Sequence, residues 1–157
     1  GIVSYGIGHQ AGLLGLRPVM ALKTVIGTVR ELPADTSVSY GRTYLTRQPT
    51  RAGVLPIGYA DGLHRTLSNR WRVWTPCGTA PILWRICMDM CMVDLTGLPQ
   101  VREGDEVEVY GPHNSVNEAA GLAGTIAYEL TCAVSKRVLR VYRRNGREIA
   151  RELLLRT

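Results

Sequence analysis

Tyrosine and arginine alternate in one short segment of this chain, and both residue types can take part in acid–base chemistry. Within Ser37–Tyr44 the side chains of Tyr40, Arg42 and Tyr44 share one face if the segment is extended, because side chains alternate along a strand. A phenol, with an ordinary pKa of about 10, becomes a usable proton donor and acceptor when nearby cations or hydrogen bonds lower that pKa. Two tyrosines on a strand are also typical of simple packing, so spacing alone leaves both interpretations open.

Two further segments combine reactive and structural residue types. Residues 57–62 place Tyr59 at the end of an apolar run, immediately before the turn-forming pair Asp61-Gly62. Residues 85–92 contain three of the four methionines and two of the four cysteines, with Asp89 as the single acid. Alone, the first pattern indicates a hairpin corner, and the second indicates a core strand filled by flexible thioethers. Asp89 has no explanation in that structural interpretation.

Two other patterns carry little functional weight. Gly6, Gly8 and Ala11 satisfy the spacing of a dinucleotide-binding fingerprint, but two more glycines and a proline follow where a helix is required, which favours a glycine-rich connector. Of the four cysteines only Cys87 and Cys91 are close in sequence, whereas a zinc site needs paired close spacings. We therefore expect reduced thiols and no metal site.

Composition limits the classes of protein that this chain can represent. A length of 157 residues, with 45% hydrophobic and 20% charged residues, suits one globular domain. No apolar run is long enough to span a membrane, and no secretion signal is visible, which points to the cytoplasm. The net charge of +6 comes from arginines spread over many segments, so we expect neither a nucleic-acid nor a membrane partner.

Strand signals dominate the chain and predict a mostly β, barrel-like fold with a short helical segment. The expected strands, separated by Gly, Pro, Asp or Asn, are Val19–Leu32, Ser37–Tyr44, Val54–Tyr59, Trp71–Thr75, Ile82–Met88, Cys91–Leu95, Glu106–Tyr110 and Arg137–Arg143.

Helical signals are confined to the region after residue 114. Ser115 and Glu118 form a capping-box pattern at the start of one helix, and a second helix is expected over Thr125–Val134. The pair Asn145-Gly146 is a tight hairpin signal, which predicts that Arg147–Leu155 returns as a last strand.

The order of the motifs is more specific than any one of them. Together they closely resemble the C-terminal domain of alanine racemase, from residue 1 to the last helix. The motifs are Gly1-Ile2 with Tyr5-Gly6, Val38-Ser39-Tyr40-Gly41, Gly58-Tyr59-Ala60-Asp61-Gly62, Arg85-Ile86-Cys87-Met88-Asp89 and Thr125-Ile126-Ala127-Tyr128-Glu129.

The resemblance implies a role in interconverting L-alanine and D-alanine with pyridoxal 5'-phosphate, for D-alanine biosynthesis and the bacterial cell wall. Members of this family are head-to-tail homodimers in which an N-terminal barrel carries the lysine that binds the cofactor covalently. Residues 1–157 are then expected to be the C-terminal β domain, with residues 1–15 as the tail of the preceding barrel region. Neither Lys23 nor Lys136 lies in a matching lysine motif, so this segment alone is expected to be inactive.

The resemblance also assigns roles to individual residues. Tyr40 matches the catalytic tyrosine, which reaches into the partner subunit's site and exchanges a proton on one face of the substrate. Met88 matches the residue whose backbone N–H meets the substrate carboxylate. Four residues match the substrate entrance: Tyr59, Arg65, Arg85 and Asp89.

The cofactor phosphate is expected at the backbone N–H groups of Gly1 and Ile2, where a glycine allows close approach, and at the hydroxyl of Tyr128. The resemblance also implies alanine rather than serine as substrate, because serine-preferring relatives tend to vary at position 128.

Three alternatives stay open at the level of the sequence. The chain could belong to a serine racemase of the same family, or to a pyridoxal-phosphate amino-acid decarboxylase of related fold, although the decarboxylase signature of a cysteine with an acid is not found. A non-enzymatic alternative is a small basic β-barrel that binds nucleic acid.

Overall fold

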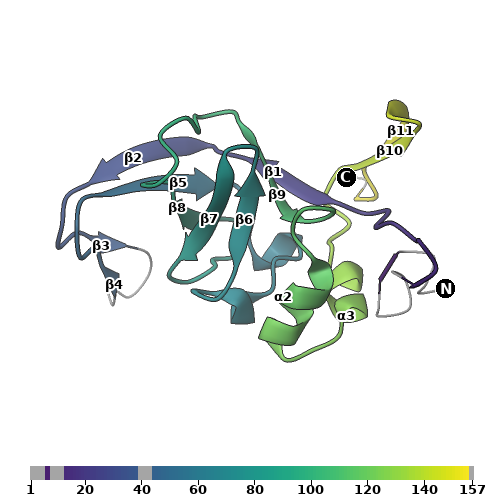
Figure 1. Ribbon diagram of the computed structural model, residues 1–157, viewed down its shortest axis with the longest axis horizontal. Helices are drawn as coiled ribbons and strands as arrows, with labels where there is room; N and C mark the ends of the chain where they lie inside the picture. Colours follow the sequence, from purple (N-terminus) through teal and green to yellow (C-terminus); the bar gives the residue numbers. More distant parts are fainter. Residues whose placement is uncertain (1–5, 8–12, 39–43, 156–157) are drawn as a thin grey trace.

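The computed structural model describes residues 6–7, 13–38 and 44–155. The candidate residues Gly1, Ile2 and Tyr40 lie outside the described residues. The body of the molecule is a sheet of seven strands in the order β1-β9-β6-β7-β8-β5-β2 (Figure 1). The strands are β1 (Leu22–Val25), β2 (Thr28–Leu32), β5 (Thr50–Leu55), β6 (Arg72–Thr75), β7 (Gly78–Leu83), β8 (Cys91–Asp94) and β9 (Glu106–Tyr110).

The two end strands of this sheet, β1 and β2, are consecutive in the chain, and the link between them joins both sides of the sheet. The N–H of Ile26 donates to the carbonyl oxygen of Asp105 at 2.9 Å, next to β9, and the N–H of Gly27 donates to that of Val54 in β5 at 2.8 Å. The sheet therefore curls back on itself, and all its strand pairs are antiparallel. The predicted mostly β, barrel-like fold is confirmed.

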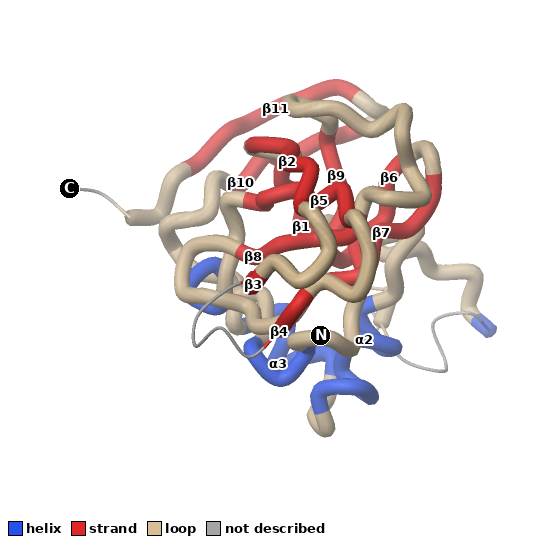
Figure 2. Tube along the Cα trace, turned by 90° about the vertical axis from the view of Figure 1, so that its left-hand side faces the viewer, coloured by secondary structure: helices blue, strands red, loops and turns tan. Residues whose placement is uncertain are grey.

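The other elements lie around this sheet, and Figure 2 shows the helices gathered toward one side of it. They are the strand pair β3 (Ser37–Val38) and β4 (Tyr44–Leu45), the 3-10 helices η2 (Tyr59–Asp61) and η3 (Arg65–Leu67), the helices α2 (Val116–Ala123) and α3 (Ala127–Cys132), and the hairpin β10 (Arg140–Arg144) with β11 (Arg147–Glu152).

Apolar side chains on one face of the strands and on α2 and α3 form a single core. Its largest buried side chains are Trp71 and Tyr110, whose ring centroids are 6.1 Å apart. The indole N–H of Trp71 donates to the carbonyl oxygen of Val109 at 3.0 Å, so the buried polar atom of the ring is satisfied. This core fixes the strand ends from which the loops described below extend.

Several strand predictions differ from the structure. The expected strand Val54–Tyr59 overlaps β5 only at its first two residues, because β5 covers Thr50–Leu55 and Tyr59 begins η2. The strand expected from Arg137 begins at Arg140. Val19–Leu32 is divided at Ile26-Gly27, because there the backbone changes its partner strand from β9 to β5. Ser37–Tyr44 is not one strand, since β3 and β4 within it pair antiparallel with each other. Ile82–Met88 is too long: β7 ends at Leu83, and Trp84 follows with a positive φ of 59° that no strand accommodates.

Both helices and the last hairpin are confirmed, with changes in detail. Ser115 occupies the N-cap position of α2, but no capping box forms, because the carboxylate of Glu118 instead bonds Arg72. The second helix, α3, ends at Cys132 and is shorter than predicted. Asn145 and Gly146 both have positive φ, 50° and 76°, as a tight hairpin turn requires.

Candidate functional site

Two segments that carry candidate residues meet through their backbones. The N–H of Tyr59 donates to the carbonyl oxygen of Cys87, and the N–H of Ala60 to that of Met88, both at 3.0 Å. This approach requires a glycine at position 58, because a Cβ there would lie 2.3 Å from each of the two carbonyl oxygens. The turn that begins η2 therefore rests directly on the Met88 loop, defined here as residues 87–90.

The η2 turn is closed by Asp61 and Gly62, as the turn signal predicts. One carboxylate oxygen of Asp61 accepts the N–H of Gly58 at 2.9 Å. Gly62 has a φ of 113°, and a Cβ on it would lie 2.8 Å from the Cα of Val134. The chain that follows α3 thus packs against the turn from the other side, where the N–H of Ser135 donates to the carbonyl oxygen of Asp61 at 3.3 Å.

Arg137 joins these segments through its side chain. Its Nε donates to Oδ1 of Asp61 at 2.7 Å, and its Nη2 donates to Oδ1 of Asp89 at 2.6 Å. The hydrogen bonds to Asp61 and then to Asp89 raise the pKa of Arg137 above its ordinary value. We call this arrangement the Arg137 bridge: one guanidinium that holds an acid of the η2 turn and an acid of the Met88 loop.

Met88 lies in an exposed loop, so the expectation of a core strand over residues 85–92 is wrong for this residue. Its side chain is 53% exposed, and the neighbouring Tyr59 and Met90 are 42% and 46% exposed. The carbonyl oxygen of Met88 is occupied by Ala60, whereas its N–H donates to no atom among the residues that the structure describes. An open N–H on a loop fixed by its neighbours can receive an anion.

The two candidate arginines belong to neighbouring segments. Arg65 begins η3, and Ser68 after it links η3 to the strand end: its hydroxyl donates to the carbonyl oxygen of Arg65 at 2.6 Å and accepts the N–H of Ile86 at 3.1 Å. The guanidinium of Arg85 lies 5.7 Å from the ring centroid of Trp84. Five of the candidate residues therefore come from two adjoining stretches, 58–65 and 85–89.

Tyr128 lies on a different element, the helix α3, and is partly buried. Its phenol hydroxyl bonds no atom within the described parts of the chain, so it is a donor that could hold an anionic group such as a cofactor phosphate. Lys23, in contrast, pairs with Glu106 at 2.6 Å on the surface of the sheet. Among the described residues, the Tyr128 hydroxyl is thus available for an anion, whereas Lys23 is already paired with an acid.

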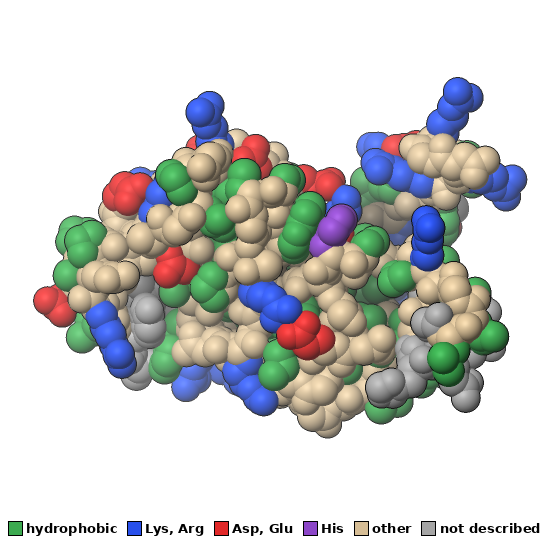
Figure 3. Space-filling view, in the orientation of Figure 1, with side chains coloured by type: hydrophobic (Ala, Val, Ile, Leu, Met, Phe, Trp, Pro, Cys, Tyr) green, Lys and Arg blue, Asp and Glu red, His purple; other side chains and the backbone are tan. Residues whose placement is uncertain are grey.

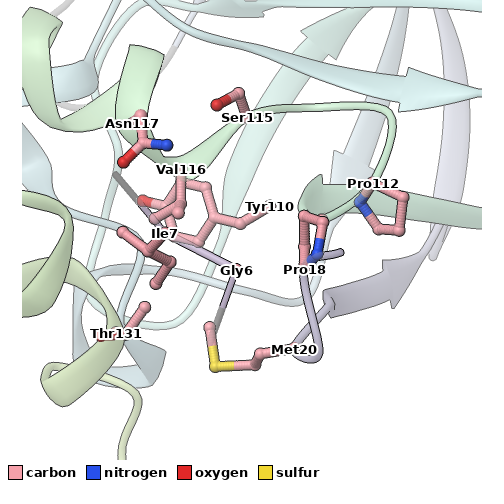
Figure 4. A pocket seen from close by; sticks show the side chains of 11 residues that line it. Gly6, Ile7, Pro18, Met20, Tyr110, Pro112, Ser115, Val116, Asn117 and Thr131 are labelled. Carbon is pink, nitrogen blue, oxygen red and sulfur yellow. The ribbon is translucent and has the colours of Figure 1, made fainter. Parts of the chain in front are cut away.

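A separate hollow opens beside the start of α2, and Figure 4 shows the side chains that line it. They come from the N-terminal segment, the end of β9, and both helices, and include Ile7, Pro18, Tyr110, Val116 and Thr131. Burial raises the pKa of Tyr110 above its ordinary range. None of the candidate residues that the structure describes lines this hollow.

No group of three or more His, Cys, Asp or Glu among residues 6–7, 13–38 and 44–155 is arranged to hold a metal ion. In the same part of the chain, no helix has the length and hydropathy needed to cross a membrane.

Sequence reasoning missed Arg137 and Asp61 as members of the site. They are 76 residues apart in the chain, and spacing carries no information on a contact at that separation. Asp61 was visible as a turn residue and as part of a family motif, without a role in the site, and Arg137 only as the first residue of an expected strand. The single available signal was Gly58, because a glycine before a turn can mark a close backbone approach.

Comparison with known proteins identifies the family of this arrangement. Residues 19–142 match the family model of the alanine racemase C-terminal domain. The chain belongs to the alanine racemase family. An alanine racemase from Clostridium perfringens is 43% identical over 154 residues, which are 93% of this chain and 40% of that protein. Another from Desulfovibrio desulfuricans is 44% identical over 146 residues, 90% of this chain and 39% of that protein.

Solved structures of alanine racemases have the same fold. The Bacillus anthracis enzyme with bound L-Ala-P aligns with a TM-score of 0.85 at 30% identity, covering 98% of this chain and 41% of that chain. The Clostridium difficile enzyme in complex with cycloserine gives 0.84 at 35% identity, covering 89% of this chain and 37% of that chain. The chain spans about 40% of the length of the relatives it matches, and the family resemblance predicted from the motifs is confirmed.

Proposed function

We propose that residues 1–157 form the C-terminal domain of a longer, homodimeric alanine racemase, with residues 1–15 as the tail of the barrel region. The longer protein, called here the full-length enzyme, interconverts L-alanine and D-alanine. The family match and the 40% coverage of the relatives support this proposal.

One observation carries the proposed role in substrate binding. The Met88 loop is fixed by backbone bonds from Tyr59 and Ala60, while the Met88 N–H stays open among the described residues. A donor held in this way loses little conformational freedom when it binds a carboxylate. The exposed side chains of Met88, Tyr59 and Met90 form an apolar rim of the kind that a second subunit covers.

Tyr40 is the proposed catalytic residue. Racemisation requires removal of a proton from one face of the substrate carbon and delivery of another to the opposite face. Tyr40 would hold the proton on one face, in the partner subunit's site, and a lysine of the barrel would act on the other. Both groups then flank the same substrate carbon.

The cofactor phosphate would be held by the N–H groups of Gly1 and Ile2 and by the hydroxyl of Tyr128. Pyridoxal phosphate, when bound, delocalises the negative charge that proton removal leaves on the substrate carbon. The exposed side chains at the entrance, Tyr59, Arg65, Arg85 and Asp89, would line the approach to this site, where mixed charges suit a small zwitterion.

The test is Tyr40→Phe in the full-length enzyme, with Tyr142→Phe on the exposed β10 strand as the matched control. We expect Tyr40→Phe to lower kcat by about 10²- to 10⁴-fold in the direction that needs the phenol, with cofactor absorbance unchanged. The control should keep the wild-type rates. Chirality of alanine and serine, followed in both directions, measures the rates and the substrate preference. Near-wild-type rates in both directions for Tyr40→Phe would remove this residue from the mechanism.

A further inference from the structure

Two segments far apart in the sequence converge on the Met88 loop. The η2 turn supplies two backbone N–H donors to it, at Tyr59 and Ala60. The segment after α3 supports the turn through Ser135. The backbone contacts hold the carbonyl groups of Cys87 and Met88, and the N–H of Cys87 donates to the carbonyl oxygen of Met90 at 2.9 Å, but none of these bonds involves the side chain of Asp89, which follows Met88 directly.

The Arg137 bridge fills that gap. It bonds Oδ1 of Asp89 at 2.6 Å and Oδ1 of Asp61 at 2.7 Å. Because the other oxygen of Asp61 accepts the N–H of Gly58 at 2.9 Å, an unbroken series of polar bonds runs from the start of the η2 turn to Asp89. The loop is therefore held on both sides of the Met88 N–H.

The charge of Asp89 matters as much as its position. A carboxylate one residue from an N–H that receives another carboxylate opposes that binding, because like charges at short range repel. The guanidinium of Arg137 lies between the two acids and offsets the charge of Asp89 at this point. Its fixed planar fork suits this task better than the single ammonium of a lysine.

We infer that Arg137 is a positioning residue for the substrate carboxylate: it holds the Met88 loop and offsets the charge of Asp89, so that the Met88 N–H can bind an amino-acid carboxylate. The inference rests on the proposed function, since it presumes that the Met88 N–H meets the substrate. Arg137 itself acts through Asp61 and Asp89 and need not touch the substrate.

A purely structural role makes a different prediction. The side chains of Arg137 and Asp89 are 37% and 56% exposed, and ion pairs exposed to this degree stabilise a fold little. Asp61 is 15% exposed, but without Arg137 it keeps its hydrogen bond from the N–H of Gly58. Loss of the bridge should therefore leave global stability nearly unchanged while it weakens carboxylate binding.

The experiment compares variants of the full-length enzyme. Arg137→Gln is expected to raise KM for alanine by at least about tenfold, with a smaller change in kcat. Inhibition by propionate, which is alanine without its amino group, should weaken by a similar factor. The matched control is Arg151→Gln, which removes an arginine that pairs with Glu148 on the hairpin and should leave both values unchanged.

Two more variants separate charge from geometry. In the double variant Arg137→Gln with Asp89→Asn, loss of the uncompensated charge should return KM most of the way to the wild-type value. Arg137→Lys, which keeps the charge but cannot bond both acids equally, should raise KM by about threefold. Arg137→Lys also tests the inference if Arg137→Gln does not fold.

A readout independent of turnover is hydrogen–deuterium exchange of the peptide that contains Tyr59 and Ala60. Their amides should exchange about tenfold faster in Arg137→Gln, because the bonds to the Met88 loop open more often. Unchanged KM and exchange in Arg137→Gln, or a double variant as impaired as the single one, would overturn this inference. A wild-type enzyme that does not racemise alanine would instead overturn the proposed function, and the exchange result would still stand by itself.

Discussion

The interior of the seven-stranded sheet and the β10–β11 hairpin are stabilised in different ways. Core side chains such as Trp71, Val73 and Leu55 are buried in one cluster, whereas Val141, Tyr142 and Ile149 of the hairpin are 40%, 45% and 58% exposed. The hairpin projects from the body in Figure 1, and in Figure 3 its basic side chains extend into the surroundings. The body is thus held by its own packing, while the hairpin is held mainly by the pairing of its two strands.

The difference shows which regions of the chain are stabilised by packing among the described residues. A two-stranded hairpin alone is at best marginally stable in water, and the apolar side chains of this one are left uncovered by the described residues. The Met88 loop shares this property, since its backbone is fixed internally while its side chains face outward. Substitutions in the sheet interior and in the β10–β11 hairpin should therefore differ by several kcal/mol in their effect on the free energy of unfolding.

The largest effect is expected in the core, at Trp71. Trp71→Ala leaves a cavity beside Tyr110 and leaves the carbonyl oxygen of Val109 without its indole donor. The free energy of unfolding should fall by about 3–5 kcal/mol, as measured by chemical denaturation of the chain. Tyr142→Ala on the hairpin is the control and should cost far less. Equal losses in both variants would contradict the contrast between the regions.

The next effect is expected at Glu108, a buried acid of β9. Its side chain is only 3% exposed, and one oxygen accepts the N–H groups of His113 and Asn114 at 2.8 and 3.0 Å. Glu108→Gln replaces one of its acceptor oxygens by a donor in this buried turn, so the free energy of unfolding should fall by about 1–3 kcal/mol. Glu106→Gln, on the exposed part of the same strand, is the matched control. A smaller loss for Glu108 than for Glu106 would contradict the prediction.

A smaller, pH-dependent effect is expected where α2 meets β6. Hydrogen bonds from Arg72 hold the pKa of Glu118 below its ordinary value. A lowered folded-state pKa adds stability above the unfolded-state pKa, and this stability is lost as pH falls through the folded-state value. Both side chains are partly exposed, so the contribution is about 0.5 kcal/mol.

The measurement is the free energy of unfolding between about pH 6 and pH 3, where carboxylates titrate. Wild type should lose this increment at the acidic end, and Glu118→Gln should lack it throughout. The difference in free energy of unfolding between wild type and Glu118→Gln should shrink as pH falls. A difference that grows toward acidic pH would contradict a stabilising ion pair between Arg72 and Glu118.

The features that the sequence predicted correctly depend on neighbours in the chain. Asn145-Gly146 forms its turn from its own φ preferences, and Ser115 begins α2 where its cap pattern lies. The capping box fails because a partner 46 residues away, Arg72, bonds Glu118 instead. Local chemistry could not reveal that competition.

The candidate site shows the same limit. The motifs predicted roles for Tyr59, Met88 and Asp89, and these stay predictions, whereas the strand expected to hold Met88 is absent because β7 ends at Leu83. What fixes the loop is the backbone approach at Gly58 and the Arg137 bridge. Both are contacts between distant segments, and they depend on how the sheet closes.

The smallest effect is expected on the hairpin itself, at Ile149. Its side chain is more than half exposed, so Ile149→Ser removes little buried apolar surface from the chain. The free energy of unfolding should change by no more than about 0.5 kcal/mol, as measured by the same denaturation experiment used for Trp71. A serine at this position on a solvent-facing strand also leaves the pairing between β10 and β11 intact, because the ladder uses backbone groups. A loss above about 1 kcal/mol would mean that Ile149 packs against the body, and the sheet and the hairpin would then be one cooperative unit.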